Sequence, residues 1–207
     1  MNNLYKLIFI FPIFIVGCIP NIIEEKDAAK EINSLELNIF SKNGDKKYSI
    51  KSPYSVYDNF KNEFKFKNIT INIYQEDRTK YIINSDESYL SRNNKFLELK
   101  GNVKLKTISQ DEDYLFADNF IWNIEEASYL LTGNIRFENK NVILTSGKAK
   151  LGSDNIIEFF DPVKYIIKDD DDENRYETNS ENAYYNINQE SLIFKAKNKR
   201  VSSMIYF

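Results

Sequence analysis

The chain has 207 residues, a usual length for one domain, or for one domain and an anchor. Its 28 basic and 31 acidic residues give a formal net charge of −3, so the composition does not indicate a nucleic-acid-binding protein. There is no histidine, which removes the commonest general base and zinc ligand, and the single cysteine excludes an internal disulfide. The apolar set is rich in Ile, Phe and Tyr, a mixture that favours half-buried strands.

The first residues are typical of an export signal. Lys6 precedes the apolar run LIFIFPIFIV (7–16), which is too short for a spanning helix, since about 20 residues are needed. The run continues into IVGC (15–18), which resembles a bacterial lipobox, in which the cysteine receives a diacylglyceryl group. We predict a signal peptide at 1–17 and lipid attachment at Cys18, with acyl chains contributing about 0.8 kcal/mol per buried CH₂. The alternative is a buried or free thiol after an uncleaved segment.

A polar segment follows the cysteine. Residues 18–34 are predicted to be a lipidated tether, with a short helical character around Glu24 to Ile32. The remaining residues, 35–207, are predicted to form one β domain.

That domain is built from a repeat. YIINSDESYLSRNNKFLELKGNVKL (81–105) aligns without gaps on DYLFADNFIWNIEEASYLLTGNIRF (113–137), 32 residues later. Each copy has a small residue followed by Asp, then a polar turn, then alternating apolar positions and Gly-Asn. Weaker copies cover 48–74, 143–165 and 176–200, which makes about five units. Each unit is too short to bury its own apolar face, so neighbouring units must pair or stack.

Within each copy, apolar and polar residues alternate with a period of two, which predicts strands with one buried face. Polar turns are predicted at 91–95 and 123–128. Gly101 and Gly133 fall inside strands, where glycine commonly marks a bulge or bend that turns a strand from one sheet into another. The sequence therefore predicts an all-β fold, an elongated antiparallel jelly-roll or open sandwich of repeated hairpins.

Several residues could be mistaken for functional groups. Asp86 and Asp118 recur at equivalent positions, which indicates hydrogen bonding at turns or strand ends and not a catalytic pair. Trp122, the only tryptophan, is predicted to be a packing residue or a plug at the end of the sheet. KDDDDEN (168–174) has no glycine at the bend of a calcium loop and is predicted to be a solvated hairpin loop. No catalytic set, metal site or cofactor site is predicted, so we do not expect an enzyme.

The order and spacing of these motifs resemble a family. The segment 81–105, with its Ser-Asp strand, turn and Leu-x-Leu-x-Gly-Asn-Val, is similar to LptC-type periplasmic lipopolysaccharide-transport proteins, relatives of LptA and OstA-like domains. The segment 143–168 resembles the stretch that follows in that family, and the similarity runs from about Leu35 to Lys168. One departure is the lipobox, because better-known members carry a spanning N-terminal helix.

The resemblance implies a jelly-roll that holds acyl chains of lipopolysaccharide, or of a similar acylated lipid, between its sheets. It also implies transfer without catalysis, from an inner-membrane ABC transporter to an LptA-like jelly-roll joined by strand addition. The candidates for the lipid groove are Leu97, Leu99, Val103, Leu105, Tyr129, Leu131, Ile135, Phe137 and Phe194. The alternative is that these residues form a sealed core.

The C-terminal run RVSSMIYF (200–207) is apolar and strand-like. It is predicted to be an edge for strand addition by the partner, with Val201, Met204, Ile205 and Phe207 as its apolar residues. The alternative is a strand that closes the protein's own sheet. The expected location is the periplasm, lipid-anchored to a membrane, with the inner membrane favoured over the outer. The rival function is a structural or adhesive surface lipoprotein with a closed β core.

Overall fold

The structure is a computed structural model. It describes residues 29–91, 95–108, 113–126, 128–138, 140–152, 156–168, 173–186, 189, 191–198 and 200–206. In this part of the chain every regular element is a strand, and twelve strands form one antiparallel sheet. The prediction of an all-β, elongated antiparallel fold is confirmed.

The strands follow the hairpin units of the repeat. Their bounds are β1 (Lys30–Phe40), β2 (Lys46–Asp58), β3 (Glu63–Gln75), β4 (Arg78–Leu90), β5 (Phe96–Thr107), β6 (Tyr114–Asn123), β7 (Ser128–Glu138), β8 (Val142–Leu151), β9 (Ile156–Lys168), β10 (Asn174–Asn186), β11 (Ser191–Lys195) and β12 (Ser202–Ile205). The two best copies are the hairpins β4–β5 and β6–β7, and the predicted turns lie between their strands.

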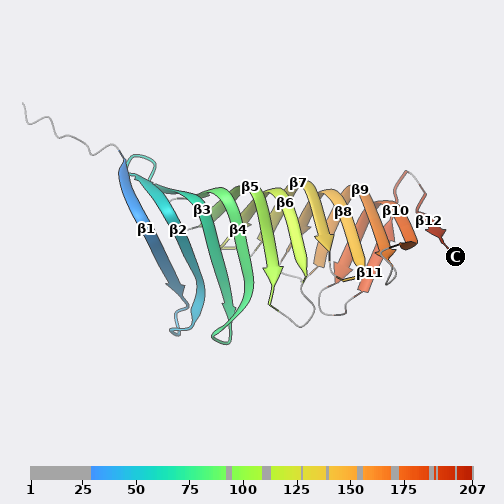
Figure 1. The fold of residues 1–207 in the computed structure, drawn as a ribbon, viewed down its shortest axis with the longest axis horizontal. Helices are drawn as coiled ribbons and strands as arrows, with labels where there is room; N and C mark the ends of the chain where they lie inside the picture. Colours follow the sequence, from blue (N-terminus) through green and yellow to red (C-terminus); the bar gives the residue numbers. More distant parts are fainter. Residues whose placement is uncertain are drawn as a thin grey trace, which may run out of the picture.

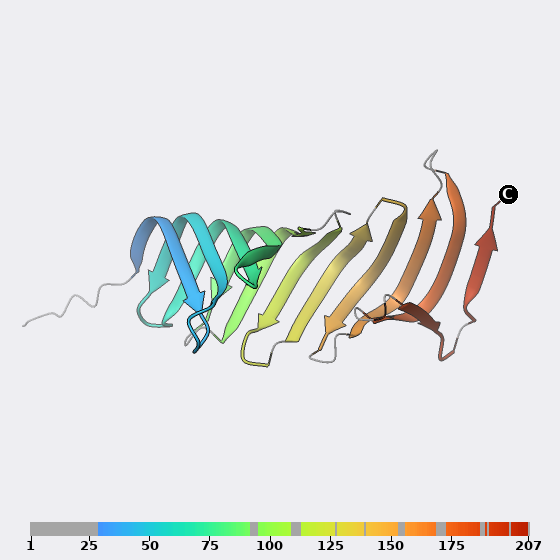
Figure 2. The same cartoon turned by 90° about the horizontal axis from the view of Figure 1, so that it is seen from below.

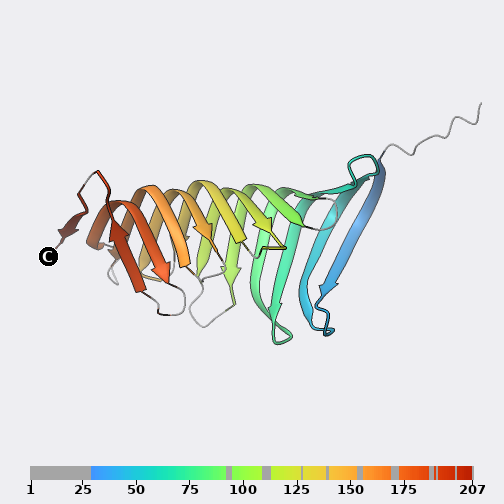
Figure 3. The same cartoon turned by 180° about the vertical axis from the view of Figure 1, so that it is seen from behind.

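The topology is a meander along the long axis of the molecule. Each strand from β1 to β10 pairs with the next, and β12 pairs with β10 (Figure 1). The view from behind shows the same order, with β1 at one end and β11 and β12 at the other (Figure 3). The molecule therefore has two ends, each bounded by edge strands.

Most strands bend near their middle, and this bend divides the sheet into two layers. Pairing is interrupted at the same level in successive hairpins, for example between Asn84 and Glu87 in β4 and between Lys100 and Val103 in β5. We call these interruptions corners. The first layer contains Lys46–Lys51 of β2 and the segments paired with it in register, and the second layer contains Tyr54–Asp58 and its partners. Figure 2 shows the strands curving over along the length of the molecule.

Glycine and asparagine build two of these corners. Gly101 and Asn102 both have positive φ, 73° and 46°, and Gly133 and Asn134 repeat this with 75° and 44°. The left-handed conformation is open to glycine and tolerated by asparagine, and strand pairing is interrupted at both pairs of residues. The prediction that both glycines mark bulges is confirmed.

Serines build the corners of the other strand in each hairpin. Ser52, Ser85, Ser146 and Ser180 are buried, and each hydroxyl donates to the carbonyl two residues later. The hydroxyl replaces a ladder bond at the place where the bend interrupts the ladder. In β6 the equivalent residue is the buried Ala117. Ile and Val from the alternate strands lie between these serines, at Ile69, Val103, Ile135 and Val163.

β1 departs from the predicted tether. The strand begins at Lys30, so the end of the segment 18–34 belongs to the sheet, and the helical character expected up to Ile32 is wrong for the described residues. Lys30 to Asn33 pair with Tyr54 to Tyr57, and Leu35 to Ile39 pair with Tyr48 to Ser52. The physical reason is that Leu35, Leu37 and Ile39 alternate with polar residues and cover the open side of β2.

Candidate functional site

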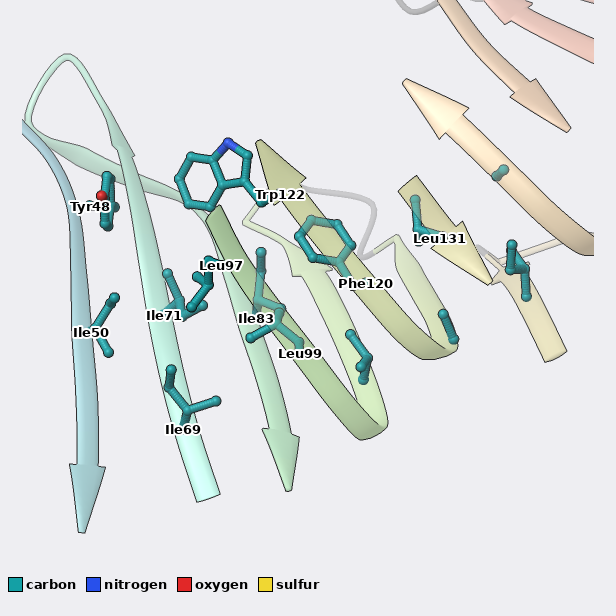
Figure 4. Close-up of a cluster of buried hydrophobic side chains, with 14 of the residues drawn as sticks. Tyr48, Ile50, Ile69, Ile71, Ile83, Leu97, Leu99, Phe120, Trp122 and Leu131 are labelled. Carbon is teal, nitrogen blue, oxygen red and sulfur yellow. The ribbon is translucent and has the colours of Figure 1, made fainter. Parts of the chain in front are cut away.

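The two layers enclose one apolar interior that runs from β2 to β11. Leu97 and Leu99 have no exposed surface, and the buried set continues along both layers (Figure 4). The core comprises Tyr48, Ile50, Phe66, Ile69, Ile71, Ile83, Leu90, Leu97, Leu99, Val103, Ala117, Phe120, Trp122, Leu131, Ile135, Leu144, Ala149, Phe159, Val163 and Ala183. This interior is the candidate site, because it is the largest apolar surface that the fold brings together.

The structure places all nine predicted groove residues in or against this core. Five are buried, namely Leu97, Leu99, Val103, Leu131 and Ile135, and four are partly buried, namely Leu105, Tyr129, Phe137 and Phe194. Leu97 pairs with Trp122, which pairs with Tyr129, so these residues form one row of the second layer. Leu105 and Phe137 both pair with Leu115 in the first layer.

Sequence reasoning named six of the twenty buried core residues, the five buried groove candidates and Trp122, and missed the others. Ile50, Ile71 and Ile83 lie side by side on β2, β3 and β4 with no exposed surface. The signal that could have found them is the same period of two, which is present in the weaker copy at 48–74 and at the start of the copy at 81–105.

The interior is packed in this structure. Two depressions of about 320 Å³ and about 210 Å³ both open on the outer face of the second layer. The larger is lined by outward residues that include Ile121, Leu130 and Phe160, with Lys148 and Lys150 beside them. Tyr129, which packs against the core, lines the larger depression, but no buried core residue lines either one, so binding between the layers requires the side chains of the two layers to separate.

Aromatic rings make contacts between the layers at two levels. We call the strand ends farthest from the corners the rim, and there Tyr48 of the first layer meets Trp122 of the second with ring centroids 5.0 Å apart. Nearer the corners, Tyr165 of the first layer meets Phe194 of the second at 5.5 Å. Burial raises the pKa of Tyr48, Tyr129 and Tyr165, which keeps these hydroxyls neutral. The prediction that Trp122 is a packing residue is confirmed.

The recurring aspartates are structural. Asn102 Nδ2 donates to Asp86 Oδ2 over 2.7 Å, and Asn134 Nδ2 donates to Asp118 Oδ2 over 2.8 Å. Each bond ties the corner of one strand to the corner of the next. The equivalent acid of β10, Glu181, accepts from the backbone N–H groups of Lys197 and Asn198, and so holds the connection between β11 and β12.

Both ends of the sheet present edges. Among the described residues, β1 pairs only with β2, and β12 pairs only with β10. The apolar residues predicted for the C-terminal edge are exposed, with Met204 at 47% and Ile205 at 62%, and Val201 is exposed beside them. Phe207 lies outside the described residues. Ser203 Oγ shares hydrogen bonds with Thr178 Oγ1 and Tyr176 OH, which fix β12 on β10.

The charged groups of the described residues are dispersed over the outer faces. Lysines lie over aromatic rings of neighbouring strands, as Lys104 does over Tyr114 at 4.4 Å. Glu177 is bonded by Asn179 and Lys164, and both bonds lower the pKa of its carboxyl. In the described part of the chain, no three His, Cys, Asp or Glu side chains come close enough to hold a metal ion.

Two predictions fall on residues that the structure does not describe. Cys18 and the signal segment lie in residues 1–28, and most of the acidic run 168–174 lies in residues 169–172. Among the described residues, no helix has the length and hydropathy needed to cross a bilayer.

Comparison with known proteins gives a family match. A family model described as "LptC: Lipopolysaccharide-assembly, LptC-related" matches residues 25–151, more than half of the chain. No curated protein is similar enough to match. Among solved structures, the chain is similar to LptH, the LptA-homologous periplasmic component of the lipopolysaccharide transport device from Pseudomonas aeruginosa. The sequence identity is 7% and the TM-score 0.40, over 77% of this chain and 94% of LptH.

Proposed function

The chain belongs to the LptC-related family of lipopolysaccharide-assembly proteins, and from this premise we propose how it handles its ligand. Proteins of this family are non-enzymatic components of a periplasmic transport bridge, and this chain is not an enzyme. We propose that it accepts lipopolysaccharide, or a similar acylated glycolipid, from an inner-membrane ABC transporter. The acyl chains are held between the two layers and passed to the next bridge protein.

The observation that carries this proposal is the continuous apolar interior between two layers that are covalently joined along the corners. At the rim, the contacts that join the layers are between side chains such as Tyr48 and Trp122. If the two layers separate at the rim, Leu97 and Leu99 of β5 become exposed. No strand pair is broken, because the strands pair with their neighbours within each layer. An acyl chain placed there gains about 25 cal/mol for each Å² of apolar surface removed from water.

The ends of the sheet support transfer from one jelly-roll to the next. The C-terminal edge at β12 offers unpaired main-chain groups beside Met204 and Ile205, and main-chain hydrogen bonds give affinity in strand addition. We propose that an LptA-like jelly-roll adds to this edge. Removing residues 202–207 should abolish capture of that partner while the unfolding temperature is nearly unchanged; undiminished capture would exclude this edge.

The anchor completes the proposal. We propose that residues 1–17 are removed as a signal peptide and that Cys18 carries the lipid, on the inner membrane in preference to the outer. The strand β1 then begins only twelve residues after Cys18, at Lys30, which keeps the sheet close to the membrane surface.

Site-specific photo-crosslinking in cells tests the lipid path. A photoreactive residue is placed at Leu99, Leu131 or Phe137, whose side chains face the interior, and lipid adducts are expected at all three. The matched controls are the neighbouring outward positions Lys100 and Thr132, where no lipid adduct is expected. Adducts confined to the protein itself at the inward positions would contradict lipid transfer and favour the rival, a structural or adhesive surface lipoprotein with a closed core.

A further inference from the structure

Trp122 holds a polar atom for which the described residues supply no partner. The side chain is 7% exposed, and its indole Nε1 is buried without a hydrogen bond. An indole N–H can only donate, and a buried donor without an acceptor costs free energy. The folded protein therefore presents an unused donor beside the apolar core, and Ser55 Oγ is the other buried side-chain atom of the described residues without a partner.

The position of this donor is the boundary between the interior and the rim. Trp122 is the last residue but one of β6, Tyr48 is the third residue of β2, and Tyr129 is the second residue of β7. The ring centroids of Trp122 lie 5.0 Å from Tyr48 and 5.6 Å from Tyr129. Together the three residues form what we call the rim cluster, which spans both layers.

The next row toward the corners on β5, β6 and β7 is apolar, and consists of Leu99, Phe120 and Leu131. Figure 4 shows the indole nitrogen on the side of the ring that points away from Leu97 and Ile83. Both of these residues have no exposed surface. Moving from the rim toward the corners along β5, β6 and β7, a ligand would therefore meet first the hydroxyl and N–H groups of the rim cluster and then the hydrocarbon of Leu99, Phe120 and Leu131.

An acylated lipid has its groups in the same order, with a polar head group and carbonyl followed by a hydrocarbon chain. Tryptophan and tyrosine favour the boundary between hydrocarbon and water, because one end of each ring is apolar and the other is polar. The burial that raises the pKa of Tyr48 and Tyr129 keeps both hydroxyls protonated, so they can donate as well as accept. A lipid carbonyl is an acceptor that lies where its acyl chain begins.

We propose that the rim cluster binds the carbonyl of the ester or amide linkage that joins an acyl chain to its head group. Trp122 Nε1–H donates to the carbonyl oxygen, and the chain runs from there past Leu99 and Phe120 toward the corners. Without lipid, Trp122 stacks on Tyr129 within the second layer and packs against the tilted ring of Tyr48, which holds the two layers together. The inference rests on the proposed lipid-binding function and adds the place where the polar and apolar parts of the ligand divide.

Tryptophan fluorescence reports on the rim cluster alone, because Trp122 is the only tryptophan in the chain. The full-length chain is titrated with monoacyl phosphatidylglycerol that carries bromine, a contact quencher, either near the carbonyl end or near the methyl end of its chain. Co-elution of lipid phosphate in gel filtration measures binding independently. Saturable quenching is expected with both probes, and it should be stronger when bromine lies near the carbonyl.

Removal of the indole N–H, together with probes that have or lack the carbonyl, tests the hydrogen bond. Trp122→Phe keeps an aromatic ring and removes the N–H, so it should bind the ester probe between about three- and tenfold more weakly. An ether-linked probe of the same chain length has no carbonyl, and the variant and the unmodified chain should bind it equally. Ile121→Ala, at the neighbouring outward position, is the matched control and should bind both probes normally.

The outcomes separate the inference from the function on which it rests. Lipid that co-elutes without quenching Trp122, or with stronger quenching from the methyl end, overturns the rim site and leaves lipid binding intact. Equal binding of ester and ether probes by the unmodified chain and by Trp122→Phe overturns the hydrogen bond. If no probe co-elutes, both the rim site and the proposed lipid binding are overturned.

Discussion

Asn134 Nδ2 donates a hydrogen bond of 2.8 Å to Asp118 Oδ2, sixteen residues earlier in the chain and on the neighbouring strand. The same bond joins Asn102 to Asp86 one hairpin before. In each case the carboxylate also lies over the glycine that precedes the asparagine. The aspartate, the glycine and the asparagine of each corner therefore depend on one another. The repeat that is visible in the sequence is therefore a repeated corner.

Gly101→Ala should destabilise the protein. A Cβ at this position would lie 2.9 Å from Asp86 Oδ2, and the backbone has φ of 73°. The left-handed conformation alone costs about 1–2 kcal/mol for a residue with a Cβ. Chemical denaturation should therefore show a loss of about 2 kcal/mol or more once the close approach is added.

The matched control for this change is Gly44→Ala. Gly44 also has positive φ, 93°, but no atom lies within 4 Å of a Cβ there. This variant should lose only the conformational part, about 1–2 kcal/mol. Equal losses for the two variants would mean that Asp86 does not constrain the corner.

Ser146→Ala should remove the support of the corner of β8. Ser146 Oγ lies 2.8 Å from the carbonyl of Lys148 and 2.7 Å from that of Phe160, and it is buried. Removing the hydroxyl leaves these partly buried carbonyls without this donor, at an expected cost of about 1–3 kcal/mol in the free energy of unfolding. The companion variant is Ala117→Ser, which installs the hydroxyl where β6 lacks it. A stability loss for Ala117→Ser as large as that for Ser146→Ala would contradict the role of the serines.

Alkaline pH should loosen the rim. Burial raises the pKa of Tyr48 and Tyr129 above the ordinary value of 10.0. Because the folded-state pKa is raised, the stabilisation is complete below pH 10.0 and is lost as pH rises through the folded-state value. The unfolding temperature should therefore fall as the pH rises above 10.0. The double variant Tyr48→Phe, Tyr129→Phe should show a smaller fall over the same pH range.

Tyr176→Phe is the control for the alkaline series. The hydrogen bond with Ser203 lowers the pKa of Tyr176, so ionisation of this residue does not oppose folding. Replacing Tyr176 should not flatten the pH dependence. If it flattens the curve as much as the double variant does, buried rim tyrosines are not its cause.

Cys18→Ser should release the protein from the membrane. The predicted lipid attachment requires the cysteine sulfur, and a serine cannot take the diacylglyceryl group in thioether linkage. We expect the unmodified protein to incorporate labelled fatty acid and to sediment with membranes, and the variant to do neither. Incorporation of label into Cys18→Ser would place the lipid elsewhere or refute the lipobox.

The sequence by itself determined the strands and the unit from which they are built. The period of two in 81–105 and 113–137 specified which residues face inward, because side chains alternate along a strand. The Gly-Asn pairs marked the bends, since few other residues adopt the left-handed conformation. Side-chain alternation and backbone conformation are local properties, so they can be predicted from residues that are adjacent in the sequence.

Only the tertiary structure decided what meets across the two layers. Tyr48 and Trp122 lie 74 positions apart in the chain, and nothing in either segment indicates that their rings touch. That contact depends on how sharply every intervening strand bends and how many hairpins separate the two. The serines at the corners, the start of β1 at Lys30 and the position of β12 on β10 were likewise decided by pairing partners distant in sequence. The physical reason is that the sequence of a strand determines which of its faces is apolar, whereas the residues that cover this face belong to other strands.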